Sequence, residues 1–265
     1  GIDLYDLLYA FEHENRFGFG EVGYLLLSGS LPTREQLSLF TAMIGEARAL
    51  PDNFTEDMIM RAPSPDIMNK LASATLALYS YDPTPDEIST ENILRQGIGL
   101  MAKFPVIISH AYQARRRYFE GKSMFLHEPD PKLSTAENIL RLIRPDGSFT
   151  DDEAKLLDRC LIIHAEHGGG NNSAFTAHVV SSSGTDTYSA IAAAVGSLKG
   201  PRHGGANLKV VQMFDDIKAH VTDWSDQDAV YQYLLRILAG EAGDHSGLIY
   251  GMGHAIYTLS DPRAV

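Results

Sequence analysis

Apolar residues recur at helical spacing along nearly the whole chain, and this period constrains the fold more than any other feature. After Thr33, the apolar side chains of Leu37, Phe40, Ile44 and Ala47 follow at intervals of three and four residues, as on one face of a helix. Segments with the same period lie at 64–78, 90–119, 134–143, 150–164, 186–199, 205–217 and 225–240. The apolar residues expected to face the core include Ile93 in the segment 90–119, and Val211, Phe214 and Ile217 in the segment 205–217. No convincing stretch alternates apolar and polar residues as a half-buried strand does, so the sequence predicts an all-α protein of about nine helices.

Signals for helix starts support these boundaries. In a capping box, a Ser or Thr side chain accepts a backbone hydrogen bond, and a Glu or Gln three residues later reaches back. The pairs of this kind are Thr33 with Gln36, Ser134 with Glu137, and Thr150 with Glu153. Ser64–Pro65 and Ser225 are further expected starts. Inside the longest segment, Pro105 predicts a kink, and Arg115–Arg117 near its end either complement the helix dipole or bind an anion.

Composition excludes several classes of protein. The 265 residues suffice for one large domain or two smaller ones, and 44% hydrophobic with 21% charged residues is ordinary for a globular chain. A single cysteine, Cys160, excludes an internal disulfide and favours a reducing compartment. No apolar run is long enough for a membrane span, and residues 1–9 lack the pattern of a signal peptide. We therefore expect a cytoplasmic protein, although a mitochondrial matrix form whose leader has been removed would look the same.

Net charge restricts the partners. The formal charge of −12 argues against nucleic acid, because a nucleic-acid-binding protein presents a basic face. An anionic ligand would be repelled by the overall field. Such a ligand would therefore need cationic groups concentrated in one cleft.

Three histidine-containing glycine clusters interrupt the helical pattern, at 164–173, 200–207 and 250–254. Glycine costs about 1 kcal/mol relative to alanine inside a helix, so the clusters are poor helix interiors. They suit close approach of the backbone to a ligand and leave N–H groups free at the start of a following helix, where anions bind. A histidine held there can donate a hydrogen bond or exchange a proton near pH 7.

Other interpretations of these histidines remain open. His164 and His167 are three residues apart, and together with Cys160 they could hold a metal ion. However, H-A-E-H matches neither H-E-x-x-H nor H-x-x-E-H. His164 continues the apolar stripe of Leu157 and Leu161, which favours a core-facing, hydrogen-bonded histidine. No G-x-S-x-G elbow or nucleotide-binding glycine loop is present.

These clusters resemble the citrate synthase family. The family shows H-x-x-H leading to a Ser, then G-P-x-H-G-x-A-N, then G-x-G-H-x-x-Y and D-P-R. An earlier stretch, G-E-V-G-Y-L-L-L-S-G-S-L-P-T, is also similar to the family's pattern. The matching segments, in register, are 20–33, 164–173, 200–207, 251–257 and 261–263.

The resemblance implies an all-α, citrate synthase-like fold in a homodimer. It implies that 1–205 form most of a large helical domain and that 206–265 begin a small one. The implied reaction condenses acetyl-CoA with oxaloacetate to give citrate and CoA. Acetyl-CoA would then be a cosubstrate, with no metal and no permanently bound cofactor.

The resemblance also implies roles for single residues. His203, as a neutral imidazole, would donate a hydrogen bond to the enolate oxygen of acetyl-CoA, and Ser173 would orient it. His254 would polarise the oxaloacetate carbonyl. His167 and Arg263 would bind oxaloacetate, with Arg263 forming a bidentate carboxylate contact.

Two further groups of residues complete the predicted site. Asn171 would support the loop that carries His167. The backbone expected to lie along CoA comprises Leu248, Ile249, Tyr250, Gly251, Met252 and Gly253.

The sequence also departs from the family pattern. The family's catalytic Asp and two further arginines come well after D-P-R, and none of them appears before Val265. We therefore expect the chain to be part of a longer protein and these 265 residues alone to be inactive. Glu166 stands where the family commonly has Asp, which we expect to be a mild change. Alternatives that remain open are a 2-methylcitrate synthase using propionyl-CoA and a non-catalytic homologue.

Overall fold

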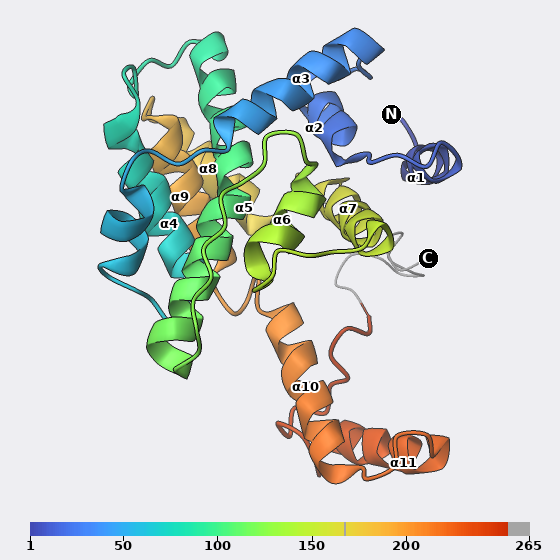
Figure 1. The fold of residues 1–265 in the computed structure, drawn as a ribbon. Helices are drawn as coiled ribbons and strands as arrows, with labels where there is room; N and C mark the ends of the chain where they lie inside the picture. The colour runs from blue at the N-terminus through green and yellow to red at the C-terminus, as the bar shows by residue number, and fades with distance from the viewer. Residues whose placement is uncertain (167, 254–265) are drawn as a thin grey trace. The chain divides into compact units, whose positions relative to one another are not determined.

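The computed structural model describes residues 1–166 and 168–253, and over these residues the secondary structure is helical with no strand (Figure 1). The all-α prediction is therefore confirmed. The helices are α1 (Leu4–His13), α2 (Phe19–Ser28), α3 (Arg34–Ala47), α4 (Ile67–Leu78), α5 (Thr90–Glu120), α6 (Thr135–Ile143), α7 (Asp151–Glu166), α8 (Asn172–Ser181), α9 (Thr187–Leu198), α10 (Ala206–His220) and α11 (Gln227–Leu238). Among the described helices, none is both long and apolar enough to cross a membrane.

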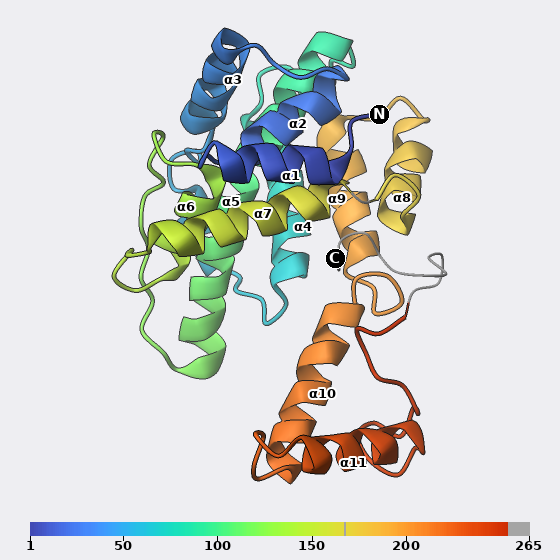
Figure 2. The same cartoon turned by 90° about the vertical axis from the view of Figure 1, so that its right-hand side faces the viewer.

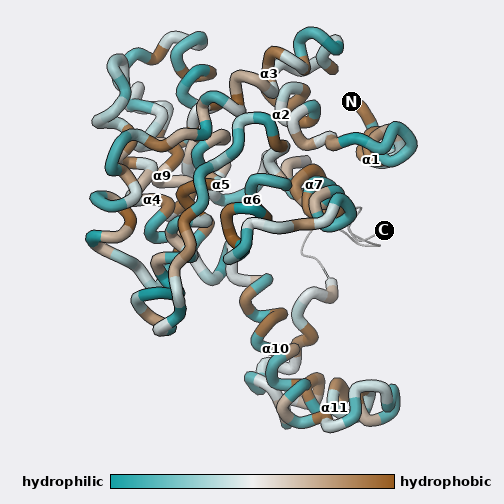
Figure 3. Tube along the Cα trace, in the orientation of Figure 1, coloured by the Kyte–Doolittle hydropathy of each residue, from teal (hydrophilic) through white to brown (hydrophobic). Residues whose placement is uncertain are grey.

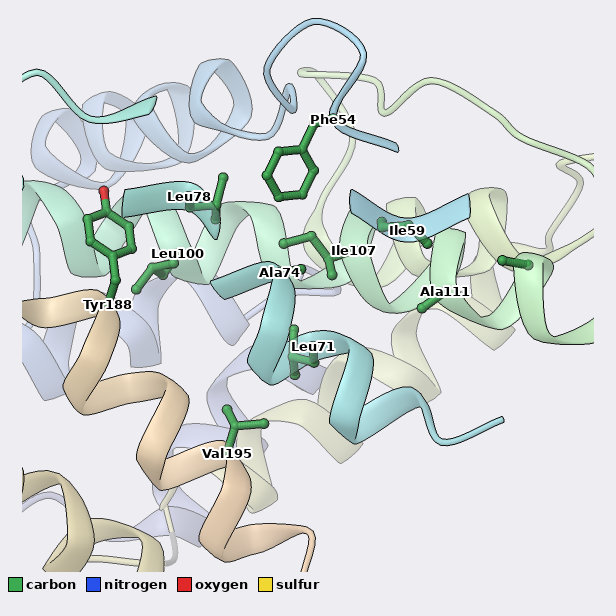
Figure 4. Close-up of a cluster of buried hydrophobic side chains, with 11 residues drawn as sticks. Phe54, Ile59, Leu71, Ala74, Leu78, Leu100, Ile107, Ala111, Tyr188 and Val195 are labelled. Atoms are coloured by element: carbon green, nitrogen blue, oxygen red, sulfur yellow. The ribbon is translucent and has the colours of Figure 1, made fainter. Parts of the chain in front are cut away.

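The chain divides into two compact units, Gly1–Ser197 and Leu198–Val265. In the first unit, α5 lies at the centre and packs against α3, α4 and α6 (Figures 1 and 2). Its main hydrophobic cluster joins α4, α5 and α9 to a short π-helix at Thr55–Met60 (Figure 4). The fully buried Phe54 and Ile59 come from around this π-helix, which the sequence pattern did not predict.

The predicted capping boxes form. The side chains of Thr33 and Ser134 each accept a hydrogen bond from the backbone of the third helical residue, and the reciprocal bonds are also present. Two other helix starts were predicted wrongly, because Asp66 caps α4 and Asp226 caps α11. Both aspartates lie one or two residues beyond the predicted serines, and a carboxylate accepts helix N–H groups at least as well as a hydroxyl.

The amino-terminal turn of α5 buries polar residues instead of the predicted Ile93, which is 43% exposed. Asn92 donates from Nδ2 to the carbonyl oxygens of Thr84 and Glu87, at 2.9 and 2.7 Å. Gln96 is also buried. The carbonyl groups of the loop before α5 need hydrogen-bond donors, so polar side chains occupy the buried face at this end of the helix.

In the second unit, α10 and α11 pack through Met213, Ile217, Tyr233 and Ile237. Hydrophobic positions occur on more than one side of α10 (Figure 3), and the sequence pattern identified the buried side only in part. Of the apolar residues predicted to face the core, Val211 and Phe214 are 51% and 52% exposed, whereas Ile217 is buried. The helix is rotated so that Met213 faces α11, and periodicity alone could not distinguish these faces.

Candidate functional site

His203 lies in a tight turn directly before α10. The backbone N–H groups of His203 and Gly204 both donate to the carbonyl oxygen of Gly200, at 2.9 and 3.1 Å. A Cβ atom on Gly204 would lie 2.1 Å from the carbonyl oxygen of Leu198, and one on Gly205 would lie 2.3 Å from that of Pro201. These two glycines are therefore required by the turn itself, which holds the half-buried His203 at the start of a helix.

The start of α10 is electrostatically suited to an anion. Gly205 is its N-cap and supplies no side-chain acceptor, so the first-turn N–H groups keep their donor capacity and partial positive charge. This arrangement gives the second unit a local site of positive potential despite the net charge of −12.

The loop before α8 is fixed by short-range contacts. The N–H of Asn171, the N-cap of α8, donates to the carbonyl oxygen of Gly168 at 3.0 Å. Gly168 has a φ of 141°, and a Cβ atom there would lie 2.8 Å from Nδ2 of Asn171. Asn172 donates to the Ser197 hydroxyl at 2.7 Å, which ties the start of α8 to the end of α9. Ser173 lies in the first turn of α8.

Three predicted site residues, His167, His254 and Arg263, lie outside the described residues. Ser173 belongs to the first compact unit and His203 to the second, so the orienting role of Ser173 stays a prediction. A pocket of about 670 Å³ in the first unit is lined from α2, α3, α6 and α7, and none of its lining residues belongs to the predicted site.

The predicted position of His164 in the core is wrong. His164 is exposed, and its Nδ1 lies 2.6 Å from the carbonyl oxygen of Cys160. The buried stripe of α7 instead runs through Ala154, Asp158 and Ile162. In residues 1–166 and 168–253, no group of three His, Cys, Asp or Glu side chains is placed to hold a metal ion.

Asp158 is a buried carboxylate that the sequence pattern did not identify. It is 3% exposed, and its oxygens accept hydrogen bonds from the backbone N–H groups of Gly18, at 2.7 Å, and Phe19, at 3.3 Å. Burial raises the pKa of Asp158. A Cβ atom at position 18 would lie 2.3 Å from the Phe11 ring, so a glycine is required there. Asp158 thereby caps α2 from α7.

The segment expected to lie along CoA runs beside the start of α10. A Cβ atom on Gly251, whose φ is 87°, would lie 3.2 Å from Cγ2 of Val210. Tyr250 packs against the hydrophobic cluster of the second unit. Leu248 and Met252 on either side are 56% and 76% exposed. The segment is thus held to its unit through the adjacent Ile249 and Tyr250, and it exposes the residues on either side.

The described residues define an all-helical protein of two units, in which glycine-dependent turns place a histidine at a helix start. The chain matches the family model described as citrate synthase, C-terminal domain, over residues 1–265. It is 35% identical over 252 residues to a 2-methylcitrate synthase 1 of Corynebacterium glutamicum, covering 92% of this chain and 60% of that protein. A citrate synthase of Deinococcus radiodurans is 33% identical over 246 residues, with coverages of 93% and 60%.

Solved structures agree with these matches. The crystal structure of citrate synthase from Pyrobaculum aerophilum superposes with a TM-score of 0.77 at 27% identity, covering 98% of this chain and 61% of that one. The chain belongs to the citrate synthase family, whose members are transferase-type enzymes. It spans about 60% of the length of the curated relatives that it matches.

Proposed function

We propose that the protein containing this chain condenses acetyl-CoA with oxaloacetate to give citrate and CoA. The observation that carries the proposal is the turn that fixes His203 before α10, where an imidazole and uncapped backbone N–H groups can meet a developing negative charge. Membership of the citrate synthase family supports the same reaction.

The reaction proceeds through an enolate. A base removes a proton from the methyl group of acetyl-CoA, and the negative charge moves to the thioester oxygen. His203 donates a hydrogen bond to this oxygen, and Ser173 orients the imidazole. His254 donates to the oxaloacetate carbonyl, whose carbon accepts the new carbon–carbon bond. Hydrolysis of the thioester by water then releases citrate and CoA.

The remaining site residues bind the substrates. His167 and Arg263 hold oxaloacetate, and Asn171, at the N-cap of α8, supports the loop before that helix. The backbone of 248–253 lies along CoA, where glycines permit close approach. The reaction needs no metal and no permanently bound cofactor, because the thioester itself acidifies the methyl group.

The test of this proposal is release of free thiol from acetyl-CoA in the presence of oxaloacetate. His203→Ala should lower kcat by about 10²–10³-fold with a much smaller change in KM, because the lost hydrogen bond forms fully only in the transition state. A change confined to KM would make His203 a binding residue. We propose that residues 1–265 by themselves are inactive, and near-normal turnover by them would contradict the role assignment.

A second candidate function is 2-methylcitrate synthesis from propionyl-CoA. It is favoured by the 35% identity to a 2-methylcitrate synthase. One methyl group changes binding in a pocket by about 1–3 kcal/mol, so the preference depends on few contacts. The ratio of kcat/KM for the two thioesters decides between the functions. A non-catalytic homologue would fail to bind oxaloacetate or CoA in calorimetry.

We also propose that the protein is a homodimer in which a second copy covers α8. No residue of α8 is buried, and its Phe175 and Val179 are 65% and 52% exposed. A helix with unburied apolar residues next to a predicted site residue is typical of an oligomer interface. In sedimentation velocity, the wild-type protein should sediment as a dimer and the Phe175→Asp variant as a monomer. A monomeric wild-type protein, or a variant that remains dimeric, would contradict the proposal.

A further inference from the structure

In the second unit, one carboxylate joins two segments that are far apart in sequence. Oδ2 of Asp244 accepts hydrogen bonds from Nζ of Lys209, at 2.9 Å, and from the hydroxyl of Tyr250, at 2.7 Å. The Lys209 ammonium also lies 5.5 Å from the centre of the Tyr250 ring. Each of these three residues therefore contacts the other two, and together they form the Lys209–Asp244–Tyr250 triad.

The triad connects the start of α10 to the segment at 248–253. Lys209 lies in the first turns of α10, and Tyr250 lies in the middle of the segment. The next residue, Gly251, packs closely against Val210, the residue after Lys209. Two successive residues of the segment are thus held against two successive residues of the helix, which determines the position of the segment along the helix.

The same turns of α10 also hold His203. The helix begins immediately after Gly205, whose backbone packs against that of Pro201 in the His203 turn. The helix start is therefore a common support for the histidine turn and for the segment at 248–253. A pocket of about 200 Å³ opens beside the triad, and its lining includes Lys209, Tyr250 and the exposed Leu248.

An ion pair this exposed contributes little to folding stability. The Lys209 and Asp244 side chains are 46% and 37% exposed. The ion pair matters more for geometry than for stability. Because the Asp244 carboxylate accepts hydrogen bonds from two donors, it orients the Tyr250 ring and the backbone on both sides of Tyr250. The arrangement is therefore better suited to positioning a loop than to stabilising the unit.

We propose that Lys209, Asp244 and Tyr250 are positioning residues that hold the 248–253 segment in the register needed to bind acyl-CoA. The inference rests on the proposed function, because it takes CoA as the ligand of this segment. The triad acts on binding of the CoA substrate and leaves the chemical step at His203 unchanged.

The experiment is steady-state turnover of the complete protein with Tyr250→Phe and Lys209→Met. Each variant should raise KM for acetyl-CoA by about three- to tenfold, which corresponds to the loss of one hydrogen bond, and leave kcat within about twofold. Lys209→Arg, which retains a donor for Asp244, should restore most of the affinity. The matched control is Tyr233→Phe, which removes a hydroxyl that donates to Asp216 at 2.8 Å in the same unit. This control should leave KM unchanged.

A second measurement separates positioning from direct contact with the ligand. If Lys209 instead bound the 3′-phosphate of CoA directly, Lys209→Met would not change KM for 3′-dephospho-acetyl-CoA. Tyr250→Phe would then not change KM for either form of the substrate. These two results together would overturn the inference. Positioning instead predicts equal effects with both forms of CoA. It also predicts faster hydrogen exchange at 246–253 in both variants, without faster exchange in α11.

The possible failures are distinguishable. A wild-type protein that does not bind CoA in calorimetry contradicts the proposed function and the inference together. A wild-type protein that binds CoA, with variants whose KM and exchange are unchanged, contradicts the inference alone.

Discussion

Two carboxylates, one in each compact unit, tie together segments that are remote in sequence, and they do so in opposite environments. Asp158 is 3% exposed and accepts backbone N–H groups at the start of α2. The Asp244 side chain is 37% exposed and accepts from a lysine and a tyrosine. Burial raises the pKa of Asp158, whereas hydrogen bonds from Ser246, Lys209 and Tyr250 lower the pKa of Asp244.

The comparison indicates different purposes for the same kind of connection. A buried acceptor matters to stability, because its loss leaves N–H groups at a largely buried helix start without their partner. An exposed acceptor can be replaced by water and matters mainly for geometry. We therefore expect Asp158 to matter mainly for the stability of the first unit, and we expect Asp244 to matter mainly for the position of the segment that we propose binds CoA.

The largest expected effect comes from removing each carboxylate in turn. Asp158→Ala should lower the free energy of unfolding by about 1–3 kcal/mol, because the N–H groups of Gly18 and Phe19 lose their acceptor. Asp244→Ala should change stability little and weaken CoA binding. Urea denaturation followed by far-UV circular dichroism measures the first effect, and fluorescence of Trp224, the chain's single tryptophan, reports on the second unit. A larger stability loss in Asp244→Ala would reverse the comparison.

A smaller effect, opposite in sign for the two sites, is expected from pH. The folded-state pKa of Asp158 is raised, so its contribution to stability is present below the ordinary Asp pKa and is lost as pH rises through the raised value. The folded-state pKa of Asp244 is lowered, so its contribution is present above the ordinary pKa and is lost as pH falls.

The variants Asp158→Asn and Asp244→Asn test this difference, since an amide does not ionise. Between pH 3 and pH 7, the stability of Asp158→Asn should improve relative to wild type, and that of Asp244→Asn should worsen. If the stability of both variants relative to wild type changed in the same direction with pH, the environments of Asp158 and Asp244 would not differ as described.

The smallest expected effect is that of salt. About 1 M NaCl reduces the screening length to roughly 3 Å, which weakens the exposed contact between Lys209 and Asp244. Hydrogen exchange at 246–253 should therefore become faster, while exchange of the Gly18 and Phe19 amides should not change. Potassium sulfate should not be substituted, because sulfate strengthens apolar burial generally. Equal responses at both sites would contradict the assignment of Asp244 as the exposed contact.

Local signals in the sequence predicted local structure well. The capping box of Thr33 with Gln36 and that of Ser134 with Glu137 were identified correctly, because each pair lies three residues apart and needs no other part of the chain. The choice of the buried helix face was less successful. Both Phe214 and Met213 are apolar, and only the position of α11 decides which of them is covered.

The candidate site divides in the same way. The glycines that place His203 were visible as a motif, because Gly204 and Gly205 pack against backbone a few residues away. Two other contacts could not be predicted from spacing along the sequence. Asp158 lies 140 residues from Gly18, and Lys209 lies 35 residues from Asp244, whereas helix periodicity and capping motifs relate only residues a few positions apart.

The sequence by itself determined the all-α class, most of the helix starts, the three histidine-containing glycine clusters and the resemblance to the family that the comparisons confirm. These features depend on short-range hydrogen bonding, steric limits at glycine and recurring motifs, all of which are written in adjacent residues. Only the tertiary structure decided which helix faces are buried, that Asp158 caps α2, and that Lys209 meets Tyr250 through Asp244. Those contacts depend on how the helices pack, and packing depends on the whole chain at once.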